Sequence, residues 1–299
     1  MLTINDIKNK FPEINVTENE SMKLHTTFKI GGEARLFVKP KSIEEITGVI
    51  NLCKEANEKF EVIGRGSNLL VNDDGFDGVI ICIGEDFNEV SVNGEIIETT
   101  AGASVINLST IARDEGLTGL EFACGIPGGI GGVVAMNAGA FGGEMRDVIT
   151  HVTIFDEASG EVKEITNEEA NFRYRGSGII DNGYIVLGAR FKLTRGDKKE
   201  TEKKMQEILA ERLAHQPLES ACAGSTFKRP DGYIAAKLID DAGLKGCKVG
   251  GAMVSPKHAG IIVNTGDATA KDVLALCKHV SKVVEKKFGV KLEMEVKVI

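Results

Sequence analysis

Hydrophobic and polar residues follow strand-like and helix-like spacings from the beginning of the chain. Residues 34–39 form a short apolar run that predicts a strand. Ser42 then predicts a helix N-cap, because apolar side chains recur on one face at Ile43, Ile46, Val49, Ile50 and Cys53. Further apolar runs predict strands over 61–63, 69–71 and 78–83.

The middle of the chain predicts two hairpins, a helix and a closing strand. Asn93-Gly94 interrupts an alternating stretch over 89–99, and Asn-Gly is the preferred pair for a two-residue hairpin turn. A second hairpin is predicted around Ser159-Gly160. Ser104 predicts the cap of a helix that runs through Ala112 and ends near Gly116. Residues 184–193 predict the strand that closes this region.

The last third differs in composition. A charged segment, 194–204, leads into a polar-faced helix that ends near Arg212, and this shift predicts a domain boundary. Beyond it the pattern predicts helices over 232–242 and 271–288, and strands over 250–254, 260–263 and 291–299. The predicted class is α+β, with a glycine-rich ligand domain followed by a smaller α/β domain.

Composition narrows the classes of function. The chain has 299 residues and a formal charge of -8, which argues against a general binder of nucleic acid but is compatible with a local basic pocket for a small phosphate ligand. No apolar run approaches the ~20 residues of a membrane span, and the start lacks an apolar signal core. Six dispersed cysteines show no metal-ligand spacing and predict reduced thiols, so we expect a cytoplasmic protein without a metal site.

Clustered glycine is the unusual feature. The first cluster is Gly64-Arg65-Gly66-Ser67-Asn68, which follows a predicted strand. Successive backbone N–H groups in such a turn can form a nest for phosphate oxygens. The cluster is neither a Rossmann fingerprint, since Leu69 replaces the third glycine and a strand follows, nor a P-loop, since it lacks the GK[ST] ending.

The second cluster covers 125–144 and is rich in glycine and alanine. It offers little to a core, so close approach of the backbone to a large flat ligand explains it better than a set of tight turns, which stays the alternative. A phosphate nest together with a small-residue wall suits a flavin dinucleotide. The candidate cofactor-binding residues are Gly64, Arg65, Gly66, Ser67, Asn68, Ile126, Pro127, Gly128, Gly129, Gly132, Asn137 and Gly139.

Six segments then occur in one order: GRGSNLL, GIPGGIGGVVAMNAGAFGGE, FRYRGS, AGSTFKRP, LKGCKVGGAMVSPKHA and LEMEVKVI. Each segment is weak evidence alone, but in this order they closely resemble the UDP-N-acetylenolpyruvoylglucosamine reductase (MurB) family, over residues 26–299. The short stretch between Arg190 and Ser225 resembles the compact second type of that family.

The resemblance implies a two-part FAD-binding domain of the vanillyl-alcohol-oxidase (PCMH) type and a smaller α/β substrate domain. The expected parts are 1–75 joined by the strand 290–299, then 76–197, and a substrate domain over 198–289. It also implies noncovalent FAD, NADPH as hydride donor, and reduction of UDP-N-acetylglucosamine enolpyruvate to UDP-N-acetylmuramate in peptidoglycan precursor synthesis. We expect a monomer.

The resemblance further implies three catalytic residues. Ser225 is the proton donor, while Arg175 and Glu295 stabilise the enolate that develops after hydride addition. The planar guanidinium of an arginine suits a carboxylate. A carboxylate at position 295 would repel the enolate unless it is protonated or acts through a neighbouring cation. Strand alternation places Glu293 on the same face, as the alternative acid.

Candidate substrate residues follow from the same motifs. Lys245 and His258 match family positions near the UDP-sugar, and Lys228 and Arg229 follow the serine closely. Arg229 and His258 depart from the asparagine and glutamine of relatives, and Phe141 stands where some relatives have tyrosine. Tyr174 either contacts substrate or is a half-buried strand residue.

Two other functions are compatible with parts of the pattern. One is another FAD-dependent oxidoreductase of the same fold, such as an alcohol oxidase, in which a histidine or cysteine often tethers the flavin. The other is a non-catalytic module that senses a UDP-sugar, although such a module has no need for Ser225, Arg175 and Glu295 together.

Overall fold

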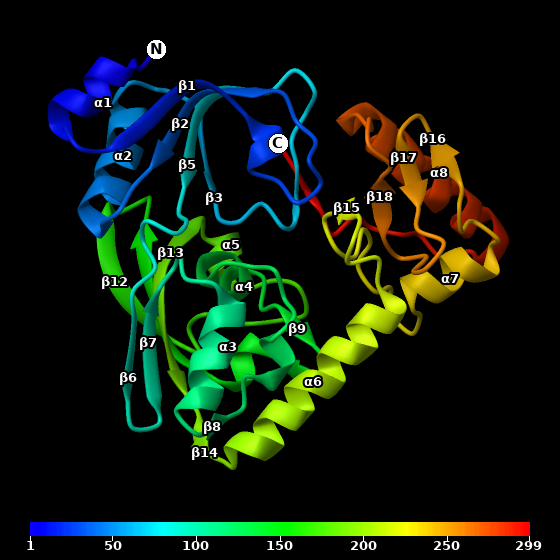
Figure 1. Cartoon of the computed structure of the whole chain (residues 1–299). Coiled ribbons are helices and arrows are strands. Elements are labelled where there is room, and N and C mark those ends of the chain that lie inside the picture. Colours follow the sequence, from blue (N-terminus) through cyan, green and yellow to red (C-terminus); the bar gives the residue numbers. More distant parts are fainter. The chain divides into compact units, whose positions relative to one another are not determined.

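The structure is a computed structural model of residues 1–299, and its backbone divides into two compact units (Figure 1). The first unit comprises Met1–Glu18, Leu36–Arg65 and Gly78–Glu211. The second comprises Asn19–Arg35, Gly66–Asp77 and Arg212–Ile299. Each unit is therefore assembled from segments that lie far apart in the sequence.

A five-stranded antiparallel sheet forms the centre of the first unit, in the order β12-β11-β13-β7-β6. Its strands are β6 (Val90–Asn93), β7 (Ile96–Thr100), β11 (Ile149–Asp156), β12 (Glu161–Thr166) and β13 (Tyr184–Lys192). Asn93 pairs with Ile96, so the first hairpin turns at Gly94-Glu95, one residue later than the predicted Asn93-Gly94, and the register of β11 with β12 brackets the predicted turn at Ser159-Gly160. Both hairpins are thus confirmed.

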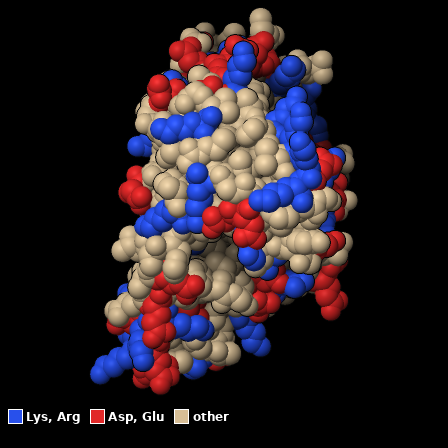
Figure 2. Space-filling model, turned by 90° about the vertical axis from the view of Figure 1, so that its right-hand side faces the viewer, with Lys and Arg blue, Asp and Glu red and all other residues tan.

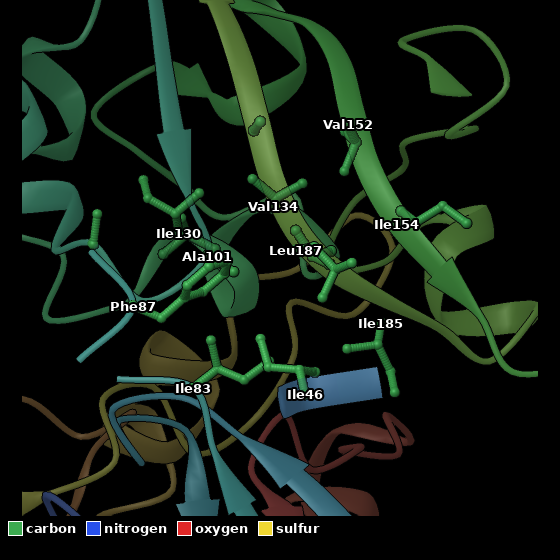
Figure 3. Close-up of a cluster of buried hydrophobic side chains, with 14 of the residues drawn as sticks. Ile46, Ile83, Phe87, Ala101, Ile130, Val134, Val152, Ile154, Ile185 and Leu187 are labelled. Carbon is green, nitrogen blue, oxygen red and sulfur yellow. The ribbon is translucent and has the colours of Figure 1, made fainter. Parts of the chain in front are cut away.

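Short helices pack on this sheet and complete the main core. They are α3 (Val105–Asp114), α4 (Ile130–Ala135) and α5 (Gly178–Asp181), of which α4 and α5 contact β13. Figure 3 shows Ile130 and Val134 of α4 facing Leu187 of β13 among further buried apolar side chains. Ser104 caps α3 as predicted, by accepting a hydrogen bond from the N–H of Asn107.

A four-stranded sheet has the order β1-β2-β5-β3, and the division between the units falls within three of its strands. The strands are β1 (Asn15–Ser21), β2 (Glu33–Lys39), β3 (Phe60–Ile63) and β5 (Phe76–Cys82), and β3 and β5 are parallel. Helices α1 (Ile4–Lys10) and α2 (Ile43–Glu55) belong to the first unit. The predicted Ser42 cap holds the start of α2 by accepting from the N–H of Glu45.

The second unit contains a four-stranded antiparallel sheet and the long helix α8 (Ala270–Phe288). The sheet order is β15 (Ala221–Cys222), β18 (Ile262–Asn264), β17 (Ala252–Val254) and β16 (Lys248–Val249). Helix α8 contacts β16, β17 and α7 (Ala235–Asp241). Thr269 and Asp272 form a capping box at its start, and Gly289 ends it with a φ of 71°.

Three sequence predictions need correction. The predicted strand 291–299 is regular only at β19 (Lys297–Val298), which runs parallel to β4 (Leu69–Leu70). Helix α6 (Lys198–His215) begins inside the charged segment that was expected to precede it. Helix α7 begins at Ala235, because the residues after Gly232 form a turn.

The remaining elements are short. They are two strand pairs, β8 (Leu117–Thr118) with β14 (Thr194–Arg195) and β9 (Gly139–Ala140) with β10 (Gly143–Glu144), and the 3-10 turns Met22–Leu24, Glu121–Ala123 and Met145–Asp147. None of the helices has both the length and the apolar character needed to cross a membrane. Basic and acidic side chains both occur across the face drawn in Figure 2.

Candidate active site

The loop Gly64–Asn68 between β3 and β4 has the backbone properties of an anion nest. None of its five N–H groups donates a hydrogen bond to the protein. A Cβ added to Gly64 would meet no atom within 4 Å, so packing does not require glycine there. Gly66 has a φ of 62°, and a Cβ would lie 1.9 Å from the carbonyl oxygen of His25. Unused N–H groups beside an unhindered glycine fit close approach by phosphate oxygens. Arg65 pairs with Glu85 at 2.9 Å.

The second glycine cluster, residues 125–144, contains both a helix that packs in the core and a candidate ligand surface. Ile130, Val133 and Val134 of α4 lie in the core, so part of this stretch packs as a helix, which the sequence did not predict. The N–H groups of Ile130 and Gly131 already donate to carbonyl oxygens of Ala103 and Ala101, so they are not available to a phosphate. The candidate ligand surface is therefore the preceding turn, where Pro127 is exposed, and the exposed Gly132, at which an added Cβ would again meet nothing within 4 Å.

Within the first unit, Arg65 of the first glycine loop lies close to the second glycine cluster. A Cβ built on Gly129 would lie 3.6 Å from Cγ of Arg65. Gly128 is held against α3, because its carbonyl oxygen accepts from the N–H of Val105. Ile126 precedes it in the same turn and is half-buried. These contacts fit one continuous backbone surface for a dinucleotide.

Asn137 is fully buried and holds three chain segments together. Its backbone is left-handed, with a φ of 43°, a conformation that asparagine tolerates better than most residues. The amide Nδ2 donates to the Glu144 carboxylate at 2.8 Å and to the Arg173 carbonyl oxygen at 3.2 Å. The amide oxygen accepts from the N–H of Arg146 at 2.9 Å. Asn137 therefore fixes the turn that carries Arg175 relative to the glycine cluster.

Arg175 lies in the tight turn 173–176, closed by hydrogen bonds between the backbones of Arg173 and Gly176. Its φ is 51°, a strained value for a residue with a long side chain. The guanidinium donates to the carbonyl oxygen of Gly139 at 3.2 Å and lies over the Tyr174 ring, 5.1 Å from its centre. Tyr174 is 51% exposed and lies in a turn, so the strand alternative for it is wrong.

Ser225 lies in an irregular segment of the second unit between Gly224, with a φ of 69°, and buried Thr226. The serine itself is exposed. Thr226 anchors the segment on one side, because its N–H donates to Gly260 and its hydroxyl oxygen accepts from the N–H of Ile262 at 3.0 Å. Sequence reasoning gave Thr226 no role, although a threonine among small residues could have signalled a buried hydrogen bond.

The C-terminal segment lies antiparallel to the serine segment. The N–H of Glu295 donates to the Thr226 carbonyl oxygen at 2.9 Å, and the N–H of Lys228 donates to the backbone carbonyl oxygen of Glu293. The structure therefore brings Ser225 and Glu295 into one neighbourhood. Lys228 forms an ion pair with Glu293, which leaves Glu295, half-buried, as the acid nearer the serine.

Asn68 joins the phosphate-nest loop to the same C-terminal segment. Its side-chain amide donates to the Glu295 carbonyl oxygen at 3.1 Å, and its own carbonyl oxygen accepts from the N–H of Lys297. Ser67 precedes it and is half-buried. Asn68 is thus a positioning residue for Glu295 as well as a candidate cofactor ligand.

Of the remaining candidates, Arg229 is exposed and Lys245 pairs with Asp240 at 2.6 Å. The Nδ1 atom of His258 is buried and makes no hydrogen bond to another residue. Burial lowers the pKa of His258, and the charges of Lys245 and His215 lower it further. Asp240 was not identified from the sequence as a partner of Lys245. The only feature in the sequence that points to this pair is their separation of five residues.

Comparisons with known proteins match both parts of the chain. Residues 216–299 match the UDP-N-acetylenolpyruvoylglucosamine reductase C-terminal domain, and residues 34–166 match an FAD binding domain. The UDP-N-acetylenolpyruvoylglucosamine reductase of Agathobacter rectalis is 46% identical, over 99% of this chain and 98% of its own. That of Clostridium novyi is 45% identical, over 98% and 96%. The structure of the Thermus caldophilus enzyme (MurB) superposes with a TM-score of 0.81 at 36% identity, covering 96% and 98%.

An FAD-binding domain followed by a reductase C-terminal domain defines this chain as an FAD-dependent oxidoreductase of mixed helix and strand structure. The predicted fold class, enzyme class and cofactor are thereby confirmed. More specifically, the chain belongs to the UDP-N-acetylenolpyruvoylglucosamine reductase family.

Proposed function

We propose that this protein reduces the enolpyruvyl ether of UDP-N-acetylglucosamine enolpyruvate to the lactyl ether of UDP-N-acetylmuramate, in peptidoglycan precursor synthesis. The reaction consumes NADPH and one proton and yields NADP⁺. Near-full-length identity to enzymes of that name supports it. The observation that supports the residue roles is the backbone pairing of the serine segment with residues 293–295, which brings the backbones of Ser225 and Glu295 into one neighbourhood.

The residues present fit FAD. The N–H groups of Gly64–Asn68 would hold its diphosphate, and the backbone around Ile126–Gly129, Gly132 and Gly139 would lie along the rest. When bound, FAD relays hydride from NADPH to the alkene. Cys124 is buried and its thiol faces the Met205 carbonyl oxygen, which supports a noncovalent cofactor.

Ser225 would give the proton that completes the reduction. The adjacent carbon of the enolate is strongly basic, so even a weak acid can protonate it when the donor is already in place. The hydrogen bonds of Thr226 fix the backbone on one side of the exposed hydroxyl. Positioned proton donors contribute about 10²–10⁴-fold in rate.

Arg175 would stabilise the negative charge that develops on the substrate carboxylate. Its strained backbone and its hydrogen bond to Gly139 keep the guanidinium at a set place within the first unit. A pre-positioned cation of this kind contributes about 10²–10³-fold. Glu295 would assist either in its protonated form or through a neighbouring cation, and the nearby Lys228–Glu293 ion pair adds no net charge.

The other expectations complete the proposal. Tyr174, Lys228, Arg229, Lys245 and His258 would contact the UDP-sugar. The FAD-binding parts would be 1–75 with 290–299, and 76–197, and the substrate part 198–289. We place the enzyme in the cytoplasm as a monomer, and its six free cysteines support a reducing compartment.

Ser225→Ala tests the proposal directly in stopped-flow experiments. NADPH should bleach the visible flavin absorbance at the rate of the unaltered protein. Return of the absorbance on adding the enolpyruvyl substrate should slow about 10²-fold or more. Ser220→Ala is the matched control, since that serine lies in the preceding turn, and it should change neither rate. Unaltered turnover in Ser225→Ala would remove the serine from the mechanism.

A further inference from the structure

Four basic side chains and one carboxylate surround a single turn of the second unit. His258 lies in that turn next to Lys257, whose ammonium donates to the carbonyl oxygen of Leu213. Lys245 approaches from the loop after α7, paired with Asp240 of that helix. His215, at the end of α6, is close enough for its charge to act on the His258 ring.

The His258 ring is held in place although its Nδ1 is unsatisfied. Its backbone N–H donates to the Ser255 hydroxyl at 3.2 Å, and its carbonyl oxygen accepts from the N–H of Ile261. A Cβ added to Gly260 would lie 3.1 Å from Cε1 and 3.3 Å from Nδ1, so the ring packs closely against this glycine. A buried polar atom without a partner is uncommon and asks for an explanation.

The turn belongs to the neighbourhood of the serine. The carbonyl oxygen of Gly260 accepts the N–H of Thr226, the residue after Ser225. A multiply charged anion bound there would meet Lys245, His215 and His258 together, with Asp240 as the opposing charge. Burial lowers the pKa of His258 and, together with the nearby Lys245 and His215, outweighs a hydrogen bond with the residue's own backbone that raises it, so the neutral ring is favoured in the free protein.

We propose that His258 takes up one proton when the UDP-sugar substrate binds, so that this chain couples substrate affinity to pH. The inference rests on the proposed function. The negative charge of the diphosphate favours the imidazolium form of the ring, in which Nδ1 carries a proton.

The sign of the effect follows from linkage. Binding raises the pKa of the ring from its lowered free value. Between the free and the bound pKa, association takes up a proton, and affinity falls by up to about tenfold for each unit of rising pH. Below the free pKa the ring is already protonated, and above the bound pKa it stays neutral, so affinity is flat in both ranges.

Isothermal titration calorimetry of the FAD-loaded full chain measures this uptake. UDP-N-acetylglucosamine enolpyruvate is added without NADPH, between about pH 6 and pH 8, in two buffers of different ionisation enthalpy. The phosphates of the ligand are diesters and its carboxyl group ionises near pH 3.5, so it exchanges no proton in this range. The unaltered protein should take up close to one proton at the middle of the window.

Three variants locate the proton. His258→Gln should bind without uptake and show a flat pH profile. His279→Gln, exposed on α8, and His215→Gln should both retain the uptake. The ¹H–¹³C signal of the His258 ring in the unaltered protein gives a second readout, because its titration midpoint should rise when the ligand is added.

The outcomes separate the two claims. Binding without proton uptake, uptake that persists in His258→Gln, or uptake that disappears in His215→Gln would overturn the role of His258 and leave the proposed function intact. Absence of binding at every pH would remove the proposed function and this inference with it. Should His258→Gln not fold, the ring titration of the unaltered protein decides alone.

Discussion

Replacing Asn137 by aspartate tests whether its amide holds the Arg175 turn to the glycine cluster. Asn137→Asp changes almost no volume, and aspartate also tolerates a left-handed backbone. The change removes both Nδ2 hydrogen bonds, to the Glu144 carboxylate at 2.8 Å and to the Arg173 carbonyl oxygen at 3.2 Å. One such bond to a charged group and one to a neutral group sum to about 2–4 kcal/mol of lost unfolding free energy.

The loss should depend on pH. The introduced carboxyl group faces the Glu144 carboxylate in a buried place, so its pKa is raised above the value in the unfolded chain. A carboxyl group whose pKa is raised by folding destabilises the folded state fully at pH values above that folded pKa. This loss of unfolding free energy shrinks as pH falls toward about 4. The difference from the unaltered protein should therefore be larger at about pH 8 than at about pH 5.

Urea unfolding followed by circular dichroism at the two pH values measures the effect. Asn93→Asp is the matched control, because Asn93 is an exposed residue at the end of β6; it should change stability by less than about 0.5 kcal/mol. A loss below about 1 kcal/mol at pH 8 in Asn137→Asp would refute the assigned hydrogen bonds.

Three further predictions follow from other contacts. Thr226→Val removes the acceptor of the buried Ile262 N–H and should cost about 1–3 kcal/mol in thermal unfolding, with Thr226→Ser closer to the unaltered protein; equal losses in both would discredit the hydrogen bond. Glu295→Gln should slow oxidation of the flavin by substrate, whereas Glu293→Gln, which only breaks the Lys228 pair, should not, and the reverse order would exchange the two acids. Burial works to raise the pKa of Glu121, but hydrogen bonds from Thr118 and Gly119 outweigh it and lower the pKa. Glu121→Gln should therefore cost about 1–2 kcal/mol near neutral pH, and this cost should shrink only as pH falls below the ordinary pKa of glutamate and through the lowered pKa of Glu121, as urea titrations at several pH values can show.

The elements that sequence predicted well are specified by their own residues. The Ser42 cap and the apolar stripe of α8 each act within one element and appear in the structure where the pattern placed them, and the hairpin at Gly94 appears with its turn one residue later than predicted. Helix α4 could not be predicted, because its glycines disfavour a helix and only the burial of Ile130, Val133 and Val134 in the core compensates.

The candidate site shows the same limit. The residue types were recognisable from motifs, but the contacts that hold them come from distant parts of the chain. The partner of Thr226 at Ile262, the link from Asn68 to Glu295, and the left-handed backbone of Arg175 depend on tertiary structure. The alternation of residues 292–296 correctly separated the acids from the buried Leu292 and Val296, but it could not show that this segment changes partners along its length.

The position of residues 293–298 late in the sequence affects when the protein can complete its folding during synthesis. The backbone N–H of Lys228 donates to the carbonyl oxygen of Glu293, which lies 65 residues later in the sequence, and residues 297–298 pair with β4. While a ribosome is still synthesising the residues between them, the serine segment lacks its C-terminal pairing partner. The serine segment can therefore reach its folded arrangement only after residues 293–298 have left the ribosome.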